Sequence, residues 1–284
     1  FEHGQEIIIR TWNSVIFKSE FTDISSVTFS DFGVWLYISE STFTNCGNGI
    51  QTTVEGCYIT IENTVFLKNQ TAINVVSIRQ SRINNCIFDN NNTSIRLHKN
   101  APSSDTDTLL ISNNIFKFNT NDISVHFTDV WIYNNLFHKS NTAIITEDSA
   151  DIKNNIFSEI QTMAITTNGS STSENSKVAT ESNLFFNCQK YFELWNTTTS
   201  SYETVVGIGT IQTKNRNNID CDAFQNIFDN PLIIDFSTAQ TDSSSVVIDA
   251  GTNIDNRLKY SSNNMVRRSD GNADNFAFVD IGPY

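Results

Sequence analysis

Several features are scarce in this 284-residue chain, and each scarcity argues against a class of protein. No run of 18 apolar residues occurs, so we expect no membrane insertion. Lysine and arginine together number 18 against 31 aspartates and glutamates, and the net charge of -13 disfavours a nucleic-acid partner or an anionic membrane surface. The chain starts at Phe1 without a signal-peptide pattern, so we interpret it as a mature protein or a trimmed fragment.

Cysteine is also sparse, and its spacing argues against two common uses. The five cysteines are odd in number and include no C-x-x-C pair, which indicates neither a disulfide framework nor a zinc site. Cys86 stands where other repeats have Asn or Thr, so we expect a small buried side chain there.

Helical signals are missing as well. No segment shows a sustained 3.6-residue hydrophobic period, and the Leu-x-x-Leu-x-Leu phrase of leucine-rich repeats is absent. The hydrophobic fraction is only 38%, with 3 prolines and 37 asparagines. This polarity does not indicate disorder, because the Ile, Val and Phe residues are periodic.

A four-residue phrase, Asn-Asn-apolar-Phe, recurs along the chain. It occurs at 113–116, 134–137 and 154–157, with looser copies that end at Phe17, Phe43, Phe66, Phe88 and Phe185. From Phe43 onward, successive phenylalanines of this set are 20 to 23 residues apart, except for two steps of 28 residues. A fixed period of this length, combined with short β-branched segments and polar turns, is typical of a solenoid.

The repeat predicts an all-β, right-handed parallel β-helix with about 20–23 residues per coil. Each strand would pair with its counterpart one coil away, at about 4.8 Å. The phenylalanines would stack inside, and the asparagines would form hydrogen-bonded ladders at the corners, where Asn also tolerates a left-handed backbone. The Asn pairs are therefore interpreted as structural.

We expect a single domain over residues 1–284. Residues 1–36 would form irregular first coils, 37–195 the regular coils, and 196–284 the last coils and an irregular C-terminal capping segment. The two 28-residue steps place insertions at 100–107 and 169–175, which should protrude on one side of the solenoid.

The closing phrases carry a resemblance to a known family. They are Asp229-Asn-Pro-Leu, Val247-Ile-Asp-Ala-Gly-Thr-Asn, Arg267-Arg with Asp270-Gly, and Asp280-Ile-Gly-Pro-Tyr. This end resembles that of secreted bacterial right-handed β-helix proteins, which are similar to pectate lyases and other polysaccharide-acting solenoids. The resemblance implies a β-helix, a secreted or cell-surface location and a polysaccharide partner. It carries over no catalytic residue, because the acidic cluster and the Asp-Asp and Gly-His phrases of those enzymes are missing from the coils.

Candidate site residues emerge when the strands that begin at Ile50, Ile73, Ile95, Ile123 and Ile144 are aligned with the Ile inward. Alternation then sends two columns outward. The first contains Gln51, Asn74 and Arg96, and the second contains His98, His126 and Glu147, with Lys99 at the edge.

This set suits β-elimination from an acidic sugar. His98 or His126, beside Glu147, would act as general base, Arg96 would neutralise a uronate, and Lys99 would assist. Asn74, Gln51 and Trp131 would bind substrate, and Trp12, Trp35 and Trp195 are further candidates for stacking on sugar rings. A divalent metal on His98, His126 and Glu147 is an alternative, as is a polar strand face without chemistry.

The sequence thus favours a polysaccharide lyase-like enzyme, ahead of a glycoside hydrolase. A non-catalytic carbohydrate-binding, adhesion or structural surface solenoid is a close alternative, and a phage tailspike-like fragment is a third. The protein would be a monomer or a homotrimer. We expect no required cofactor, although Ca²⁺ could bind the aspartates of the C-terminal segment, which are Asp249, Asp255, Asp270, Asp274 and Asp280.

Overall fold

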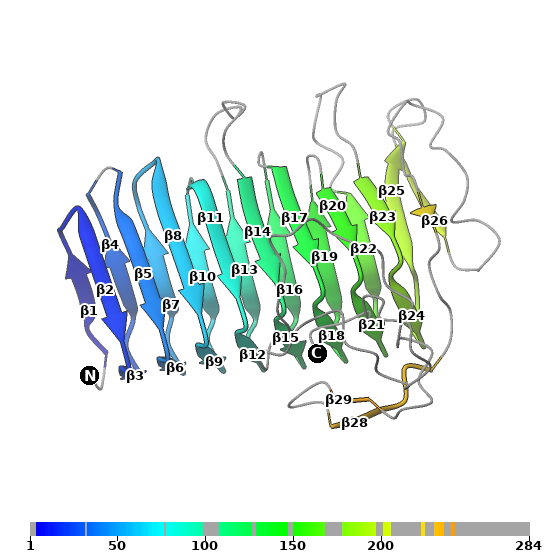
Figure 1. Ribbon diagram of the computed structural model, residues 1–284, viewed down its shortest axis with the longest axis horizontal. Helices are drawn as coiled ribbons and strands as arrows, with labels where there is room; N and C mark the ends of the chain where they lie inside the picture. Colours follow the sequence, from blue (N-terminus) through cyan, green and yellow to red (C-terminus); the bar gives the residue numbers. More distant parts are fainter. Residues whose placement is uncertain are drawn as a thin grey trace, which may run out of the picture.

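The computed structural model shows an elongated stack of coils built from three sheets (Figure 1). It describes residues 4–31, 33–76, 78–98, 108–126, 129–146, 150–167, 178–196, 201–205, 223–224, 230–235 and 240–241. Apart from the two antiparallel pairs β25–β26 and β28–β29, every strand pairing among these residues is parallel. The predicted all-β parallel β-helix is therefore confirmed.

Each coil contributes one strand to each sheet, in the order C, A, B from β2 onward. Sheet C contains β2 (Asn13–Phe17), β5 (Trp35–Ser39), β8 (Cys57–Glu62), β11 (Ile78–Asn84), β14 (Thr108–Ser112), β17 (Asp129–Tyr133), β20 (Ala150–Lys153), β23 (Val178–Glu181) and β27 (Ala223–Phe224). Sheet A contains β3 (Glu20–Thr22), β6 (Thr42–Thr44), β9 (Val65–Leu67), β12 (Ile87–Asp89), β15 (Ile115–Lys117), β18 (Leu136–His138), β21 (Ile156–Ser158) and β24 (Leu184–Phe186).

Sheet B contains β1 (Glu6–Ile9), β4 (Ser26–Phe29), β7 (Asn48–Thr52), β10 (Thr71–Val75), β13 (Thr93–Leu97), β16 (Asn121–Val125), β19 (Thr142–Thr146), β22 (Met163–Thr167), β25 (Phe192–Asn196) and the antiparallel β26 (Ser201–Val205). A separate antiparallel pair is formed by β28 (Ile233–Asp235) and β29 (Gln240–Thr241).

The N-terminal coils are more regular than the sequence pattern suggests. Residues 1–36 were expected to be irregular, yet strands begin at Glu6, and β1 to β5 already pair with the following coils, with one register shift where β4 meets β7. Their apolar residues alternate without the Asn-Asn-Phe phrase, which is why the repeat is hard to recognise there. At the other end, parallel pairing in sheet B stops at β25, close to the expected boundary at 195. Most of the expected cap, 196–284, lies outside the described residues.

A continuous stack of phenylalanine rings fills the interior under sheet A. The ring centroids of neighbouring members are 4.7 to 5.1 Å apart, and the ring planes lie within 11° of each other. The members are Phe21, Phe43, Phe66, Phe88, Phe116, Phe137, Phe157 and Phe185. Each stacked pair contributes about 0.5–1.5 kcal/mol beyond the burial of its area. The predicted stack is confirmed from Phe43 to Phe185. Its member in the preceding coil is Phe21 and not the expected Phe17, which is 49% exposed.

The first corner, between sheets C and A, carries the predicted asparagine ladder. The second Asn of each pair is buried. Its side-chain oxygen accepts a hydrogen bond at 2.8–2.9 Å from the backbone N–H of the residue at the same position one coil earlier. The ladder runs through Asn114, Asn135, Asn155 and Asn183. The first Asn of each pair has a left-handed backbone, with φ of 54° to 57° at Asn113, Asn134 and Asn154.

The second corner, between sheets A and B, carries a shorter ladder that was not predicted. It runs through Asn69, Asn91 and Asn119, each three residues after a stacked Phe. The next coil has Ser140 at this position, and the amide of Asn119 instead donates to a carboxyl oxygen of Asp122 at 2.8 Å. The three-residue spacing from Phe to Asn is present in the sequence, but the residue at this position varies between coils, as Ser140 shows.

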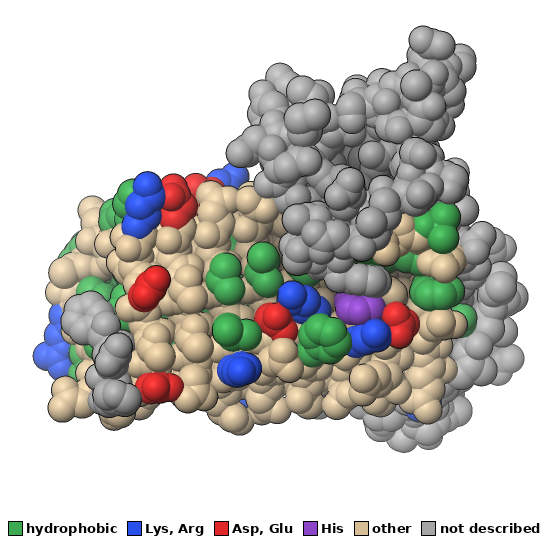
Figure 2. Space-filling view, turned by 90° about the horizontal axis from the view of Figure 1, so that it is seen from below, with side chains coloured by type: hydrophobic (Ala, Val, Ile, Leu, Met, Phe, Trp, Pro, Cys, Tyr) green, Lys and Arg blue, Asp and Glu red, His purple; other side chains and the backbone are tan. Residues whose placement is uncertain are grey.

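The outer face of sheet A is partly apolar (Figure 2). Ile115, Leu136, Ile156 and Leu184 form a buried column there, and Ile233 of β28 packs against it. Strand β28 therefore covers part of this face.

Candidate functional site

The outer face of sheet B presents the first predicted column in register. Strand pairing aligns one outward residue from each of six coils, which are Gln51, Asn74, Arg96, Ser124, Ile145 and Thr166. The isoleucines beside them are buried, as expected. Because neighbouring strands of a sheet lie about 4.8 Å apart, these side chains form a continuous row.

His98 and His126 lie next to each other at the ends of β13 and β16. The His98 backbone N–H donates to Val75 O, and the His126 backbone N–H donates to Leu97 O, both at 3.0 Å. Both residues therefore continue the parallel register beyond their strands. Each side chain is half-buried, and the charge of Arg96 acts on His98.

The two histidines differ in their surroundings. Burial, followed by the charges of Arg96 and His126, lowers the pKa of His98 below its usual value. Its Nδ1 is buried without a hydrogen-bond partner among the described residues. Protonation would put a second N–H into this unsatisfied position, so His98 favours the neutral state and is a poor proton acceptor.

His126 is better placed to accept a proton. Its Nε2 lies 3.3 Å from the hydroxyl of Ser124, two residues earlier on β16. That contact orients the ring from the same rigid strand. His126 is thus the stronger candidate for a general base.

An amide cluster continues this face toward the N-terminus. The Asn48 amide donates to Gln51 at 3.1 Å, and the Asn74 amide reaches the Asn48 oxygen at 3.5 Å. Asn74 also has a buried side-chain oxygen without a partner among the described residues. The partly exposed side chains of Gln51 and Asn74 are suited to hydrogen-bond hydroxyls of an extended ligand through their accessible atoms.

Three predicted site residues do not join this group. Lys99 and Glu147 lie outside the described residues. Trp131 is half-buried on β17 of sheet C, in register with Leu110 and Asp151, and so belongs to a different face. Among the described residues no three His, Cys, Asp or Glu side chains are arranged to hold a metal ion, and the aspartates proposed for Ca²⁺ lie outside that part.

The cysteines show no reactive setting in the described part of the chain. Cys46, Cys57 and Cys86 are buried and Cys188 is half-buried, all as free thiols. Burial raises the pKa of Cys86 to about 12, which opposes thiolate formation. The expectation for Cys86 is confirmed, whereas Cys221 lies outside the described residues.

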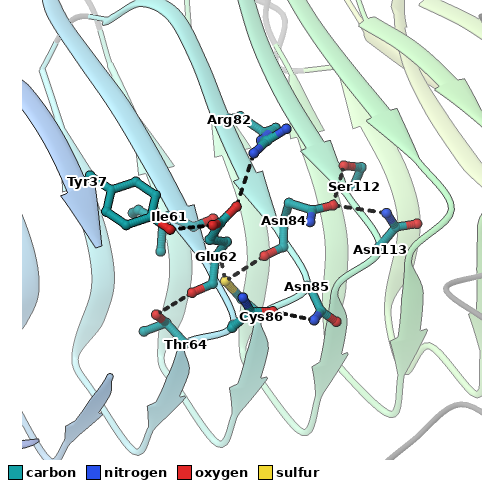
Figure 3. Close-up of polar contacts among 11 residues, drawn as sticks. Tyr37, Ile61, Glu62, Thr64, Arg82, Asn84, Asn85, Cys86, Ser112 and Asn113 are labelled. Atoms are coloured by element: carbon teal, nitrogen blue, oxygen red, sulfur yellow. Dashed lines mark hydrogen bonds and ion pairs between the residues drawn. The ribbon is translucent and has the colours of Figure 1, made fainter. Parts of the chain in front are cut away.

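A second polar cluster, on the outer face of sheet C, was missed from the sequence (Figure 3). The Glu62 carboxylate accepts a hydrogen bond from the Tyr37 hydroxyl and forms an ion pair with Arg82 at 3.0 Å. Asn84, one coil further, accepts from Ser112 and Asn113. The alternation of β5, β8 and β11 indicates that these residues face outward, but it does not show which of them meet.

Comparisons with protein-family models, curated proteins and solved structures gave no match. No helix in the described residues is long and apolar enough to cross a membrane. The fold and the arrangement of side chains are therefore the basis for function.

Proposed function

We propose that this β-solenoid binds an acidic polysaccharide along the outer face of sheet B and cleaves it by β-elimination. The observation that carries the proposal is the row of Asn74, Arg96, His98 and His126, which three neighbouring strands hold in register. A linear ligand can lie across such strands and meet one polar side chain from each coil.

Each group has a defined part in the reaction. The Arg96 guanidinium pairs with the sugar carboxylate and stabilises the negative charge that develops there. His126 removes the proton from the carbon next to that carboxylate. The bond from the adjacent carbon to the glycosidic oxygen then breaks, a carbon–carbon double bond forms, and solvent protonates the departing oxygen. His98 stays neutral and hydrogen-bonds a hydroxyl.

The charge of the whole chain affects the rate of encounter. A net charge of -13 repels a polyanion at long range, so Arg96 must act locally. We expect moderate salt to speed association, because it screens the overall repulsion more than the close pair.

The test is product formation with a panel of uronate polysaccharides, followed by ultraviolet absorbance. The wild-type protein should form the unsaturated product, and His126→Ala should lose turnover by about 100-fold or more while retaining binding. Arg96→Ala should lose both turnover and polysaccharide binding. Lys18→Ala serves as a surface control, since Lys18 is exposed, pairs with Glu40 and lies over the Phe17 ring, all away from the sheet B row. Unchanged turnover in His126→Ala would refute the assigned base.

A second candidate is a non-catalytic polysaccharide-binding surface. It is favoured by the absence of an outward carboxylate among the described residues of β10, β13, β16, β19 and β22, since such a group could assist the histidine. Binding by calorimetry without any absorbance change across the panel, lost in Arg96→Ala, would select this function over the enzyme.

A further inference from the structure

An exposed aromatic stack lies on the outer face of sheet C, away from the proposed polysaccharide row. Trp35 and Tyr58 stack with ring centroids 4.2 Å apart and planes 12° apart. The guanidinium of Arg79 lies 5.8 Å from the Tyr58 ring centre. Strand register places Asn13, Trp35, Tyr58 and Arg79 in one column, on successive coils.

The stack lacks an aromatic member in the first coil. The column position next to Trp35 is occupied by Asn13, whose short side chain cannot cover an indole. Trp35 is accordingly 59% exposed, whereas Tyr58, which lies between Trp35 and Arg79, is half-buried. The open position has the height of one coil, about 4.8 Å, which is the spacing of one stacked ring.

Neighbouring side chains provide further contacts around this position. Trp12, which is 76% exposed, precedes β2. Its backbone oxygen accepts a hydrogen bond from the backbone N–H of Trp35 at 2.8 Å. Tyr37, two residues from Trp35, is fixed by its hydrogen bond to Glu62, which also pairs with Arg82 (Figure 3). The stack is therefore bordered by oriented hydroxyl, carboxylate and guanidinium groups.

A β-bulge shapes this part of the sheet. Pairing of β11 with β8 shifts between Arg79 and Arg82, so that one extra residue is accommodated. The Ser81 hydroxyl oxygen accepts a hydrogen bond from the backbone N–H of Ile59 at 2.9 Å. Arg79 and Gln80 are both exposed. Bulges redirect side chains and are common next to functional sites.

We propose that the Trp35 face, with Asn13 and Trp12 beside it, is a binding site for one pyranose ring of an uncharged glycan. The C–H face of a sugar ring would lie on the indole, and the Asn13 amide would hydrogen-bond its hydroxyls.

The ligand class follows from the shape and charge of the site. Arg82 is paired with Glu62, and the Arg79 guanidinium contacts the hydroxyl and the ring of Tyr58. Both guanidinium groups are therefore already engaged on this face, which weakens their attraction for an anionic chain. A position one ring wide beside a stacked indole suits a sugar unit better than the broad apolar centre of a protein interface does.

The test is calorimetric titration with neutral oligosaccharides of glucose, xylose, mannose and galactose. We expect at least one to bind, with little dependence on salt, and Trp35→Ala to weaken binding about tenfold or more. Asn13→Trp would fill the open position, and should abolish binding while raising the melting temperature. Phe118→Ala, which removes an exposed aromatic ring from another face, should bind as wild type.

Several outcomes would overturn this site. They are the absence of binding by every sugar in the panel, unchanged affinity in folded Asn13→Trp, or self-association that Asn13→Trp removes. The last result would identify the stack as a contact between copies of the chain. Neutral-glycan binding should survive His126→Ala and Arg96→Ala, so failure of the sheet B proposal and failure of this one are distinguishable.

Discussion

The two asparagine corners of the solenoid solve the same problem with different chemistry. Both must satisfy backbone groups that turn between sheets, and both use buried amides stacked from coil to coil. The first corner keeps Asn from Asn114 to Asn183. The second changes after Asn119, where Ser140 accepts a backbone N–H at 3.4 Å and Asp122 accepts both the Asn119 amide and the Ser140 hydroxyl.

This difference makes the second corner sensitive to pH. Asp122 is fully buried, and burial raises the pKa of its carboxyl well above the usual value. His138, just before the same corner, is also buried, and burial lowers its pKa to about 4. The four asparagines of the first corner do not titrate. Where Ser140 replaces the ladder asparagine, the Asp122 carboxyl completes the hydrogen bonds, and this group adds a proton-dependent term to the stability of the corner.

The largest expected effect comes from breaking the first ladder with Asn135→Ala. The Asn135 amide donates to Ile111 O, Tyr133 O and Asn155, and its oxygen accepts from Asn114. All these groups are buried, so we expect a loss of about 3–5 kcal/mol in the free energy of unfolding, measured by urea denaturation. Exposed Asn92→Ala is the matched control and should change stability by less than about 0.5 kcal/mol.

A smaller effect should appear at His138 on acidification. Its folded-state pKa is about 4 against an unfolded value of about 6.5, so the unfolded chain binds the proton more readily. Its contribution to stability is therefore complete above pH 6.5 and is lost as the pH falls toward 4, by about 2–3 kcal/mol. Denaturation at several pH values should show that the free energy of unfolding falls less steeply with acidification in His138→Gln than in the wild type. Identical pH dependence in the two proteins would contradict this assignment.

Asp122 should act in the opposite direction. Its folded-state pKa is raised, so its stabilising contribution is fully present below about pH 3.9 and declines as the pH rises through the folded value. Asp122→Asn keeps an oxygen acceptor without the charge. We expect this variant to gain stability relative to wild type as the pH rises from about 4 to neutrality. A difference independent of pH would show that the carboxyl is not held in its neutral form.

The smallest effect concerns the left-handed residues of the corners. The first corner places Asn in this conformation at five coils and the second at three, and Lys68, with φ of 55°, is one of the other residues at the second corner. Asn tolerates this region better than Lys. Lys68→Asn should raise the free energy of unfolding by about 0.5 kcal/mol, seen as a small increase in melting temperature. Lys18 is also left-handed, with φ of 47°, but it is paired with Glu40. Lys18→Asn should therefore raise the free energy of unfolding by less, because it also removes this ion pair.

Sequence periodicity predicted the coils well because interior positions repeat in every coil. Phe116 and Asn114 each meet a copy of themselves, so selection for packing leaves a visible repeat. The second ladder and the regular first coils were missed, because their residues vary more from coil to coil. The columns on sheet B were predicted from alternation, whereas the different roles of His98 and His126 depend on burial that alternation does not show.

By itself, the sequence determined the β-helix, its coil length, the Phe stack and the residues that share the sheet B column, since a period-two strand and a fixed repeat leave little freedom in register. Only the tertiary structure decided which side chains meet across coils: Tyr37 with Glu62, Trp35 with Tyr58, and Asp122 with Asn119 and Ser140. Such contacts depend on side-chain length, burial and local shifts such as the β11 bulge, and these vary between coils while the backbone repeats.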